Sequence, residues 1–413
     1  MATVEQARRT EPRQDEFATL RLQRMGTLGD TVSTLEDEEV NVFGGIVGEE
    51  VVARIVRYRR RKKHYVSGLV TQVLNPSPHR VTPPCSFFGA CTGCQWQHIS
   101  YDHQLELKRE AVTEAIGEHA GLKSVRVSNT IPAKDLFGYR NHARFAVRQH
   151  GKLVFTNRIT RRFVPIDRCM IMADPVNEML ATLQDRCQET SSISIRVGLN
   201  TGERLIQPTL QLADVASGQA YYHEKLQDHR FRVSSPSFFQ TNTVQAEVLG
   251  DLVRDRLELS GDETVVDAYA GVGTFAVLLA PYASRVIAIE EADSAVKDAA
   301  INTIGIDNIE FRLGKTEEVL GGLELRPDAV VLDPPRVGCH PAALDAVSDV
   351  APERVVYVSC DPASLARDLA HLSRAGFDVA EVQPLDMFPQ THHVECVATL
   401  TRRSNVGDGD APV

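Results

Sequence analysis

One of the eight cysteines, Cys360, lies at a predicted junction between a buried strand and a helix, where its thiol can be exposed. Cys360 follows the apolar run 354–359 and opens the next helical segment. The helix dipole and free backbone N–H groups at such a position favour a thiolate, whereas the neighbouring Asp361 has the opposite effect. Of the eight cysteines, Cys360 is therefore the best candidate for a nucleophile. We expect three others to be buried thiols without a chemical role: Cys187, Cys339 and Cys396.

A glycine-containing turn, residues 267–274 (DAYAGVGT), joins a predicted strand to a predicted helix. Glycines at the carboxyl edge of a sheet allow a nucleotide to approach the backbone. Glu290 ends the next strand and is placed to accept hydrogen bonds from ribose hydroxyls. These residues suit NAD or S-adenosylmethionine, although Ala276 replaces the last glycine of the dinucleotide fingerprint. Asp333, which precedes two prolines that form a rigid lip, projects at the same edge.

The segment 386–395 (DMFPQTHHVE) leads into the last predicted strand and ends with Glu395. A carboxylate there could remove a proton near the sheet edge, and its pKa would rise if it were desolvated. A lone glutamate more often lies on the surface, so the residues alone do not decide its role. We interpret His392 and His393 as structural or RNA-facing residues rather than as metal ligands.

A second group of cysteines has the spacing of a metal centre. Cys85, Cys91 and Cys94 lie close together, and Cys169 follows 75 positions later. The two-residue spacing allows one turn to present two sulfurs to one metal. An iron–sulfur cluster and a zinc ion, held by four cysteines or by three with His98, both fit this spacing.

The elements that must position these residues change in type along the chain. Short strand-like runs before residue 75 predict a small barrel: 39–43, 49–57 and 65–73. From residue 264 onward, strands and helices alternate, which predicts a parallel, doubly wound α/β sheet. Its seven expected strands are 264–269, 285–290, 309–313, 329–333, 354–359, 377–384 and 393–400.

Positive charge is concentrated in two segments. Residues 57–63 contain six basic residues in seven, and residues 139–168 contain eight Arg or Lys against one acid, Asp167. Tyr139, Phe145, Phe155 and Phe163 are interleaved with the second set. Such a mixture is typical of an RNA surface, where cations neutralise phosphates and rings stack on exposed bases, although the rings alone would also fit a strand core.

The composition limits the class of protein. The 413 residues suggest two or three domains, and 43% hydrophobic with 24% charged residues excludes collagen, a coiled coil and general disorder. The net charge of −10 excludes a basic field over the whole protein, so contact with nucleic acid must be local. Residues 1–22 lack the apolar core of a secretory signal and no stretch approaches 18 apolar residues, so we expect a cytoplasmic protein without a membrane partner.

Together the motifs resemble the RNA uracil-5-methyltransferases that use S-adenosylmethionine, in the branch with an N-terminal TRAM-type barrel and an iron–sulfur cluster. The resemblance covers about residues 25–403. It is carried by PPC at 83–85 with the following cysteines, FGYRN at 137–141, FFQTN at 238–242, the glycine turn, DPPR at 333–336, SCDP at 359–362 and the segment 386–395. Two departures are Thr92, where many members have Gly, and Asp361, where some have Asn; neither removes a reactive atom.

This resemblance implies a role for each candidate residue. Cys360 would be the nucleophile and Glu395 the base. A [4Fe-4S] cluster would be bound by Cys85, Cys91, Cys94 and Cys169. S-adenosylmethionine would be held by Gln240, Tyr269, Thr274, Glu290 and Asp333.

The resemblance also predicts the organisation of the chain and its substrate. We expect a tail over 1–22, a TRAM/OB-like RNA-binding barrel over 23–82, a central α+β iron–sulfur domain over 83–237, a class I methyltransferase domain over 238–403, and a tail over 404–413. The expected substrate is a uridine in 23S ribosomal RNA, with transfer RNA as the alternative, and the expected state is a monomer.

Other functions share parts of this pattern. RNA cytosine-5-methyltransferases generally have a cysteine in the strand-four motif, which here reads Asp333-Pro334-Pro335, and adenine N6 chemistry requires an aromatic residue where this chain has Arg336. A non-catalytic RNA-binding protein would not need Cys360. An oxidoreductase that uses the cluster for electron transfer would bind nicotinamide.

Overall fold

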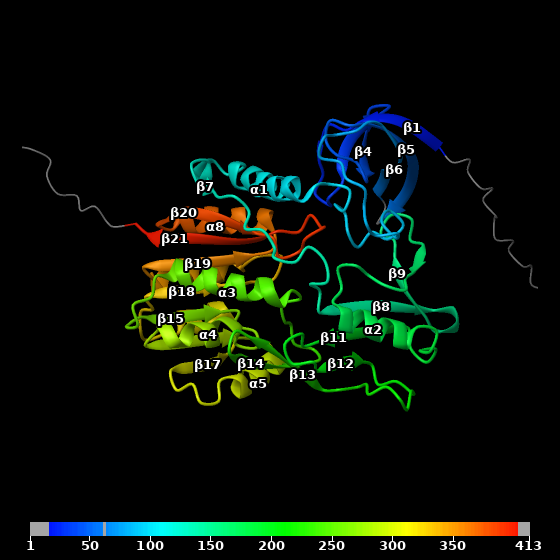
Figure 1. Cartoon of the computed structure of the whole chain (residues 1–413). Coiled ribbons are helices and arrows are strands. Elements are labelled where there is room, and N and C mark those ends of the chain that lie inside the picture. Colours follow the sequence, from blue (N-terminus) through cyan, green and yellow to red (C-terminus); the bar gives the residue numbers. More distant parts are fainter. Residues whose placement is uncertain (1–15, 61–62, 404–413) are drawn as a thin grey trace, which may run out of the picture. The chain divides into compact units, whose positions relative to one another are not determined.

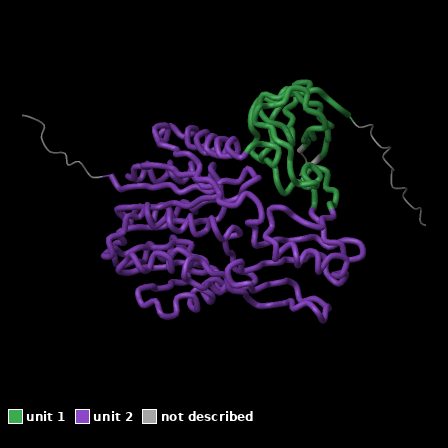
Figure 2. The backbone as a smooth tube through the Cα atoms, in the orientation of Figure 1, with its two compact units in different colours: residues 1–100, 156–164 green, residues 101–155, 165–413 purple. Residues whose placement is uncertain are grey.

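The computed structural model describes residues 16–60 and 63–403 (Figure 1). The described residues form two compact units (Figure 2). Unit 1 contains residues up to 100 together with 156–164, and unit 2 contains 101–155 and the remainder from 165. The expected N-terminal tail lies outside the described residues up to residue 15, but Glu16–Arg21 form a strand, β1, so the tail predicted over 1–22 is too long. The expected tail at 404–413 also lies outside the described residues.

Unit 1 is built on a six-stranded sheet. Its order is β1-β5-β6-β4-β3-β2, with β1 at Glu16–Arg21, β2 at Arg24–Met25, β3 at Thr31–Leu35, β4 at Glu38–Phe43, β5 at Glu50–Arg60 and β6 at Lys63–Asn75. The sheet curls, which brings β1 near β3 although these strands are not neighbours in the sheet: the Ser33 hydroxyl on β3 donates to the Arg21 carbonyl at the end of β1, 2.8 Å away. The inner face buries Val40, Val42 and Val51. The predicted small barrel is thus an incompletely closed one.

Unit 2 contains the alternating strands and helices. Its sheet has the order β17-β16-β15-β18-β19-β21-β20-β7. The strands are β15 at Thr264–Ala268, β16 at Arg285–Glu290, β17 at Ile309–Leu313, β18 at Ala329–Leu332, β19 at Arg354–Ser359, β20 at Phe377–Leu385, β21 at Glu395–Arg402 and β7 at Arg126–Val127. The seven strands predicted beyond residue 264 are all present.

Two features of this sheet differ from the prediction. β21 is antiparallel to both β19 and β20, so the sheet is mixed rather than wholly parallel. The reason is the connection between β20 and β21, which spans only residues 386–394 and contains no helix, whereas a parallel connection needs about a dozen residues or more. The second difference is β7, which comes from the segment before residue 140 and adds an eighth strand parallel to β20.

Helices cover both faces of the sheet. Successive residues of a strand point to opposite faces, so neighbouring residues of β15 pack against different helices. Val266 packs with α1 (Tyr101–Gly117), α6 (Thr316–Gly321), α7 (Pro341–Val350) and α8 (Pro362–Arg374). Val265, its neighbour on β15, packs with α3 (Thr243–Leu257) and α4 (Thr274–Leu279). α5 (Asp293–Asn302) follows β16. The predicted doubly wound arrangement is confirmed.

The segment between α1 and α3 forms smaller sheets. β8 (His142–Arg148) pairs with β9 (Lys152–Thr156) and with β11 (Ser192–Val197), which pairs with β12 (Arg204–Gln207). β13 (Tyr221–Leu226) and β14 (His229–Ser234) form a hairpin. The remaining elements are β10 (Phe163–Pro165), α2 (Asp174–Leu183) and 3₁₀ turns at Ala120–Leu122, Gln149–Gly151 and Ala280–Tyr282. None of the described helices is long and apolar enough to span a membrane.

Candidate active site

Cys360 lies at the carboxyl end of β19, immediately before α8. The helix is capped by Asp361, whose side chain accepts a hydrogen bond from the Ser364 N–H at 2.9 Å. Capping of this kind fixes the chain direction at the strand-to-helix turn. The predicted position of the thiol, at the tip of the fifth strand and before a helix, is confirmed.

The electrostatic environment of Cys360 differs from the expectation. Burial of the half-buried thiol, together with the nearby Glu395, raises its pKa to about 11, although Arg336 opposes the shift. Burial and Glu395 therefore outweigh any stabilisation of the thiolate by the helix dipole, and the thiol is protonated at neutral pH.

Glu395 begins β21, beside the end of β19, and is buried. Burial raises the pKa of its carboxyl well above the usual range, and Asp333 acts in the same direction. Asp333 follows β18 and is half-buried, with its pKa raised to about 7 by desolvation. Both carboxylates also act on the Cys360 thiol. The structure thus brings three predicted site residues from three strands into one site.

Arg336 is a site residue that sequence reasoning did not assign. It follows the two prolines after β18, and its positive charge lowers the pKa values of both the Cys360 thiol and the Glu395 carboxyl. The turn that carries it is closed by the Gly338 N–H donating to the Pro335 carbonyl at 2.8 Å. The signal was present in the DPPR motif, but only the fold shows that this arginine reaches the thiol of another strand.

The glycine turn leads from β15 into α4 at the same edge of the sheet. Gly273 has a φ of +87°, and a Cβ on this residue would lie 2.9 Å from the Phe311 ring. The Glu290 carboxylate spans the turn, because one oxygen accepts from the Gly271 N–H and the other from the Ala292 N–H, both at 2.8 Å. Each oxygen keeps a lone pair for a ligand hydroxyl.

Asp267 at the end of β15 contains an unpartnered polar atom. One of its oxygens accepts from the Ala276 N–H at 2.8 Å, whereas the other is buried and has no partner in the described residues. Burial, together with the charges of Asp333 and Glu290, raises the pKa of Asp267 to about 8. Glu290 and Asp333 are therefore close enough to share one electrostatic environment.

The other residues predicted to hold the cofactor lie around this turn. Tyr269 follows β15 with a φ of +68°, and its hydroxyl lies near Thr316 and Cys339. Thr274 begins α4. Gln240 precedes α3, and its carbonyl accepts from the Asn141 side chain at 3.1 Å. Their role in cofactor binding stays a prediction.

The candidate metal ligands belong to both units. Unit 1 holds Cys85, Cys91 and Cys94, and unit 2 holds Cys169. Burial raises the pKa of Cys91, and the neighbouring Cys85 adds to this shift. Within the described parts of the chain, no three His, Cys, Asp or Glu side chains gather closely enough to hold a metal ion. His98, the alternative ligand, is buried, and its Nε2 lies 3.1 Å from the Gly45 carbonyl.

The three cysteines expected to be buried thiols are Cys187, Cys339 and Cys396, and all three are buried.

The aromatic residues of the segment 139–168 are mostly core residues, contrary to the preferred interpretation. Tyr139 and Phe145 are buried, and Phe155 stacks on Phe145 with ring centroids 5.1 Å apart. For Phe145 the reason is the alternation of β8, which turns odd-numbered side chains inward, and Phe155 on the neighbouring β9 packs against it. Phe163 alone among these four rings is exposed.

Positive charge gathers instead around His142 on β8, because Arg140 before this strand, Arg144 on it and Arg196 on β11 all act on the His142 ring. We call Arg140, His142, Arg144 and Arg196 the β8–β11 basic face. Burial, together with the three arginines, lowers the pKa of His142 to about 4. Arg196 also donates to the Ser237 carbonyl at 2.7 Å, just before the FFQTN segment. In unit 1, by contrast, Arg57 is paired with Glu16 and Glu38.

Comparison with known proteins agrees with this site. The family model described as tRNA (uracil-5-)-methyltransferase matches residues 213–403. RNA methyltransferases of Gloeobacter violaceus and Thermosynechococcus vestitus, both described as uncharacterised, are 35% and 34% identical, over 94% and 92% of this chain and 97% of each relative. The crystal structure of Pyrococcus abyssi tRNA (uracil-54, C5)-methyltransferase with S-adenosyl-L-homocysteine has a TM-score of 0.71 and 27% identity, and covers 93% of this chain and all of that one.

The sheet and the glycine turn thus define a class I methyltransferase fold. The chain belongs to the family of S-adenosylmethionine-dependent RNA (uracil-5-)-methyltransferases.

Proposed function

We propose that this enzyme methylates C5 of a uridine in RNA through a covalent bond between Cys360 and C6 of the base. The observation that supports this most directly is the meeting of Cys360, Glu395 and Asp333 at the ends of three strands beside the glycine turn. A nucleophile, a buried base and a cofactor pocket in one place are the parts that this chemistry needs.

The thiol of Cys360 makes the pyrimidine reactive. Uracil C5 is too weakly nucleophilic to attack a methyl group, so the Cys360 thiolate adds to C6 and places the electron pair of the broken C5–C6 double bond on an enolate with density at C5. C5 would then form a bond with the methyl group of S-adenosylmethionine while the bond from that methyl group to the sulfonium sulfur breaks, and the sulfur would leave as the neutral thioether of S-adenosylhomocysteine. Because the thiol is protonated at rest, its proton must first pass to water, which the half-buried side chain can reach, and the positive charge of Arg336 stabilises the thiolate that results.

Glu395 completes the reaction. Its carboxylate removes the C5 proton, the electron pair restores the C5–C6 double bond, and the Cys360 thiolate leaves. Burial in the site raises the basicity of this carboxylate, as its raised pKa shows. The positive charge of Arg336 acts on both the base and the nucleophile, since it lowers the pKa of Glu395 and that of Cys360.

S-adenosylmethionine supplies an electrophilic methyl group on a positively charged sulfur. The residues present fit it, because Asp267 has a buried oxygen without a partner in the described residues and Glu290 offers lone pairs beside the Gly271 backbone. In the proposed arrangement Glu290 accepts from the ribose hydroxyls, and Gln240, Tyr269, Thr274 and Asp333 line the same pocket.

RNA contact is proposed at the β8–β11 basic face. Uridine must leave the base stack to expose C5 and C6, at a cost of a few kcal/mol that contacts elsewhere must offset. Three arginines around His142 provide an anion-binding surface, and Arg196 connects it to the Ser237 backbone beside Gln240. Phosphates bound here would lie next to the site.

We further propose that Cys85, Cys91, Cys94 and Cys169 bind a structural [4Fe-4S] cluster. Four thiols are the usual donors for such a cluster, and Cys91 already accepts the N–H of Gly93 at 3.4 Å, as cluster sulfurs commonly do. Zinc is the alternative occupant. Measurement of iron, sulfide and zinc in the purified protein decides between them: zinc without iron would contradict the cluster.

The favoured substrate is 23S ribosomal RNA, because the barrel and cysteine set accompany the methyltransferase domain. Transfer RNA is the second candidate, since the Pyrococcus abyssi relative acts on uracil 54 of tRNA. Mapping of 5-methyluridine in separated 23S RNA and tRNA from cells lacking the gene distinguishes them. Loss of the modification from tRNA alone would overturn the ribosomal assignment.

Replacement of Cys360 by Ala tests the mechanism. Cys360→Ala should abolish 5-methyluridine formation and leave RNA affinity unchanged, because the thiol forms the covalent bond but is not needed for phosphate contacts. The reaction is followed by transfer of labelled methyl groups, and binding by filter retention of the same RNA.

The matched control is Cys187→Ala, which removes a buried thiol of unit 2 remote from the site in sequence and should retain activity. Methylation by Cys360→Ala would show that the mechanism is wrong. Loss of RNA binding in this variant would leave a binding role for the thiol instead of a catalytic one.

A further inference from the structure

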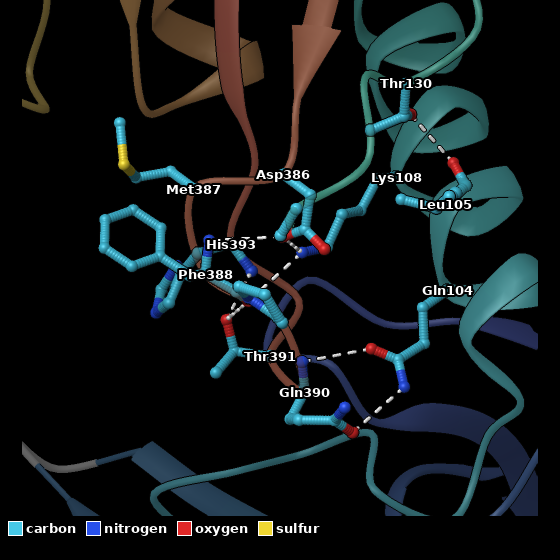
Figure 3. Close-up of polar contacts among 12 residues, drawn as sticks. Gln104, Leu105, Lys108, Thr130, Asp386, Met387, Phe388, Gln390, Thr391 and His393 are labelled. Atoms are coloured by element: carbon cyan, nitrogen blue, oxygen red, sulfur yellow. Dashed lines mark hydrogen bonds and ion pairs between the residues drawn. The ribbon is translucent and has the colours of Figure 1, made fainter. Parts of the chain in front are cut away.

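A buried ion pair joins α1 to the loop that leads to Glu395. The Lys108 ammonium donates to Asp386 at 2.5 Å, and both side chains are fully buried (Figure 3). Lys108 also donates to the Phe388 carbonyl at 3.2 Å. The two partners are separated by 278 positions in the sequence.

The other hydrogen-bonding positions of Asp386 are also occupied. The Tyr101 hydroxyl donates to its second oxygen at 2.9 Å, and the Phe388 N–H donates to the first at 3.1 Å. Tyr101 in turn accepts from the Ala133 N–H at 2.7 Å. Three donors thus replace the water that the carboxylate loses on burial, and together they fix its position.

A second pair of contacts continues this arrangement along the loop. Gln104, one turn before Lys108 on α1, donates to the Gln390 side chain and accepts from the Gln390 N–H, each at 3.1 Å (Figure 3). Gln390 has a φ of +68°, a left-handed conformation that a non-glycine residue adopts only when its surroundings hold it. The two contacts from Gln104 hold it in this conformation.

The opposite side of the loop is held by the start of α3. Gln245 donates to the Asp386 carbonyl at 3.0 Å, and Asn242 donates to the Met387 carbonyl at 3.1 Å. Tyr139 donates to the Pro389 carbonyl at 3.0 Å. Because Asn242 follows Gln240 by two residues, one loop connects the proposed cofactor segment with the proposed base.

We propose that Lys108 and Asp386 are positioning residues that hold the Glu395 carboxylate in the orientation in which it reaches the C5 proton. A buried ion pair is an expensive source of stability, since well-packed apolar residues of similar volume often stabilise a protein as much or more. What the pair provides here is a fixed starting point for the nine-residue loop 386–394, after which β21 begins at Glu395. This proposal rests on the proposed function of Glu395 and adds the groups that position it.

The test uses the full-length enzyme with Lys108→Met, which keeps the length of the side chain and removes its charge. Misplacement of a catalytic group by about 1 Å costs about 100-fold in rate. We therefore expect proton removal at C5 to slow about 10- to 100-fold, while the affinities for RNA and S-adenosylmethionine stay within about threefold. The signature is accumulation of the methylated covalent RNA–protein complex, measured on denaturing gels in single-turnover reactions.

Two further variants complete the design. Arg109→Met removes the neighbouring exposed cation of α1, which contacts Asn129 rather than the loop, and should behave as wild type. Asp386→Asn keeps the size of the side chain and removes its charge, so it serves if Lys108→Met does not fold. It should accumulate the same complex, and wild-type kinetics in Asp386→Asn would then overturn the proposal.

Glu395→Gln separates failure of this proposal from failure of the proposed function. If Glu395→Gln does not accumulate the covalent complex, the assignment of the base is wrong. If Glu395→Gln accumulates it but Lys108→Met loses activity only in proportion to its unfolded fraction, the ion pair is structural and the positioning role is wrong.

Discussion

At the scale of single residues, the site depends on how burial changes the acidity of its groups. Cys360 and Glu395 both have raised pKa values, for the same physical reason: the charged form loses water that the protein replaces only in part. Arg336 provides the compensating positive charge. A resting thiol of high pKa is protected from oxidation, because only the thiolate is strongly reactive.

This environment predicts the pH dependence of Cys360 alkylation. Because only the thiolate reacts, iodoacetamide should modify Cys360 slowly at pH 7 and about tenfold faster for each pH unit, up to a midpoint near pH 11. Arg336→Met should move this midpoint upward, since the opposing positive charge is lost. The measurement is mass spectrometry of the Cys360 peptide over a pH series, with urea-unfolded protein as the reference. A midpoint below that reference would contradict the burial argument.

At the scale of elements, the position of the site follows from the ends of strands. β15, β16, β18 and β19 run parallel, so the residues after them meet at one edge of the sheet. The antiparallel β21 starts at this edge, which is why its first residue, Glu395, meets Cys360 at the end of β19. The hairpin connection 386–394 therefore places the proposed base, Glu395, at the start of a strand that runs in the opposite direction.

The geometry of the turn between β15 and α4 predicts how much stability is lost when a methyl group is added at Gly273. Gly273→Ala should lower the free energy of unfolding by about 2–4 kcal/mol, because the left-handed backbone strains an alanine and its Cβ would meet Phe311. Gly305→Ala is the matched control: its φ is +85° but nothing lies within 4 Å, so a loss of about 1 kcal/mol is expected. Urea denaturation of both variants gives the comparison, and equal losses would show that the contact with Phe311 relaxes without cost.

At the scale of the whole molecule, the cysteine set involves both compact units. Cys85, Cys91 and Cys94 belong to unit 1, and Cys169 belongs to unit 2. A cluster bound by all four would act as a crosslink between segments that are distant in sequence, and metal binding of this kind contributes directly to folding. None of the four lies on the eight-stranded sheet, which favours a structural role over one in the reaction.

Replacement of Cys91 by Ser tests this role. Cys91→Ser should lose bound metal and lower the melting temperature by about 10 °C, because a ligand of a structural site is removed. Calorimetry and metal analysis of the variant beside Cys187→Ala give the result. A protein that keeps its melting temperature but loses an electron-transfer activity would instead indicate a redox cluster.

The sequence alone determined the alternation of strands and helices, because period and turn residues are local properties of the chain. It also determined which residues end strands. This was enough to place Cys360, Asp333 and Glu290 at one edge, because the carboxyl ends of parallel strands lie together. For the aromatic residues of 139–168 the sequence left two interpretations, strand core and RNA surface, because rings serve both purposes.

Only the tertiary structure decided the remaining contacts. Three features join residues that lie far apart in sequence: the pairing of β7 with β20, the effect of the Arg336 charge on Cys360, and the ion pair between Lys108 and Asp386. The direction of the Cys360 pKa shift was likewise undecided, because the helix dipole is local whereas burial depends on everything that packs around the thiol. Local sequence sets where each strand ends; long-range packing sets which ends meet and how much water remains between them.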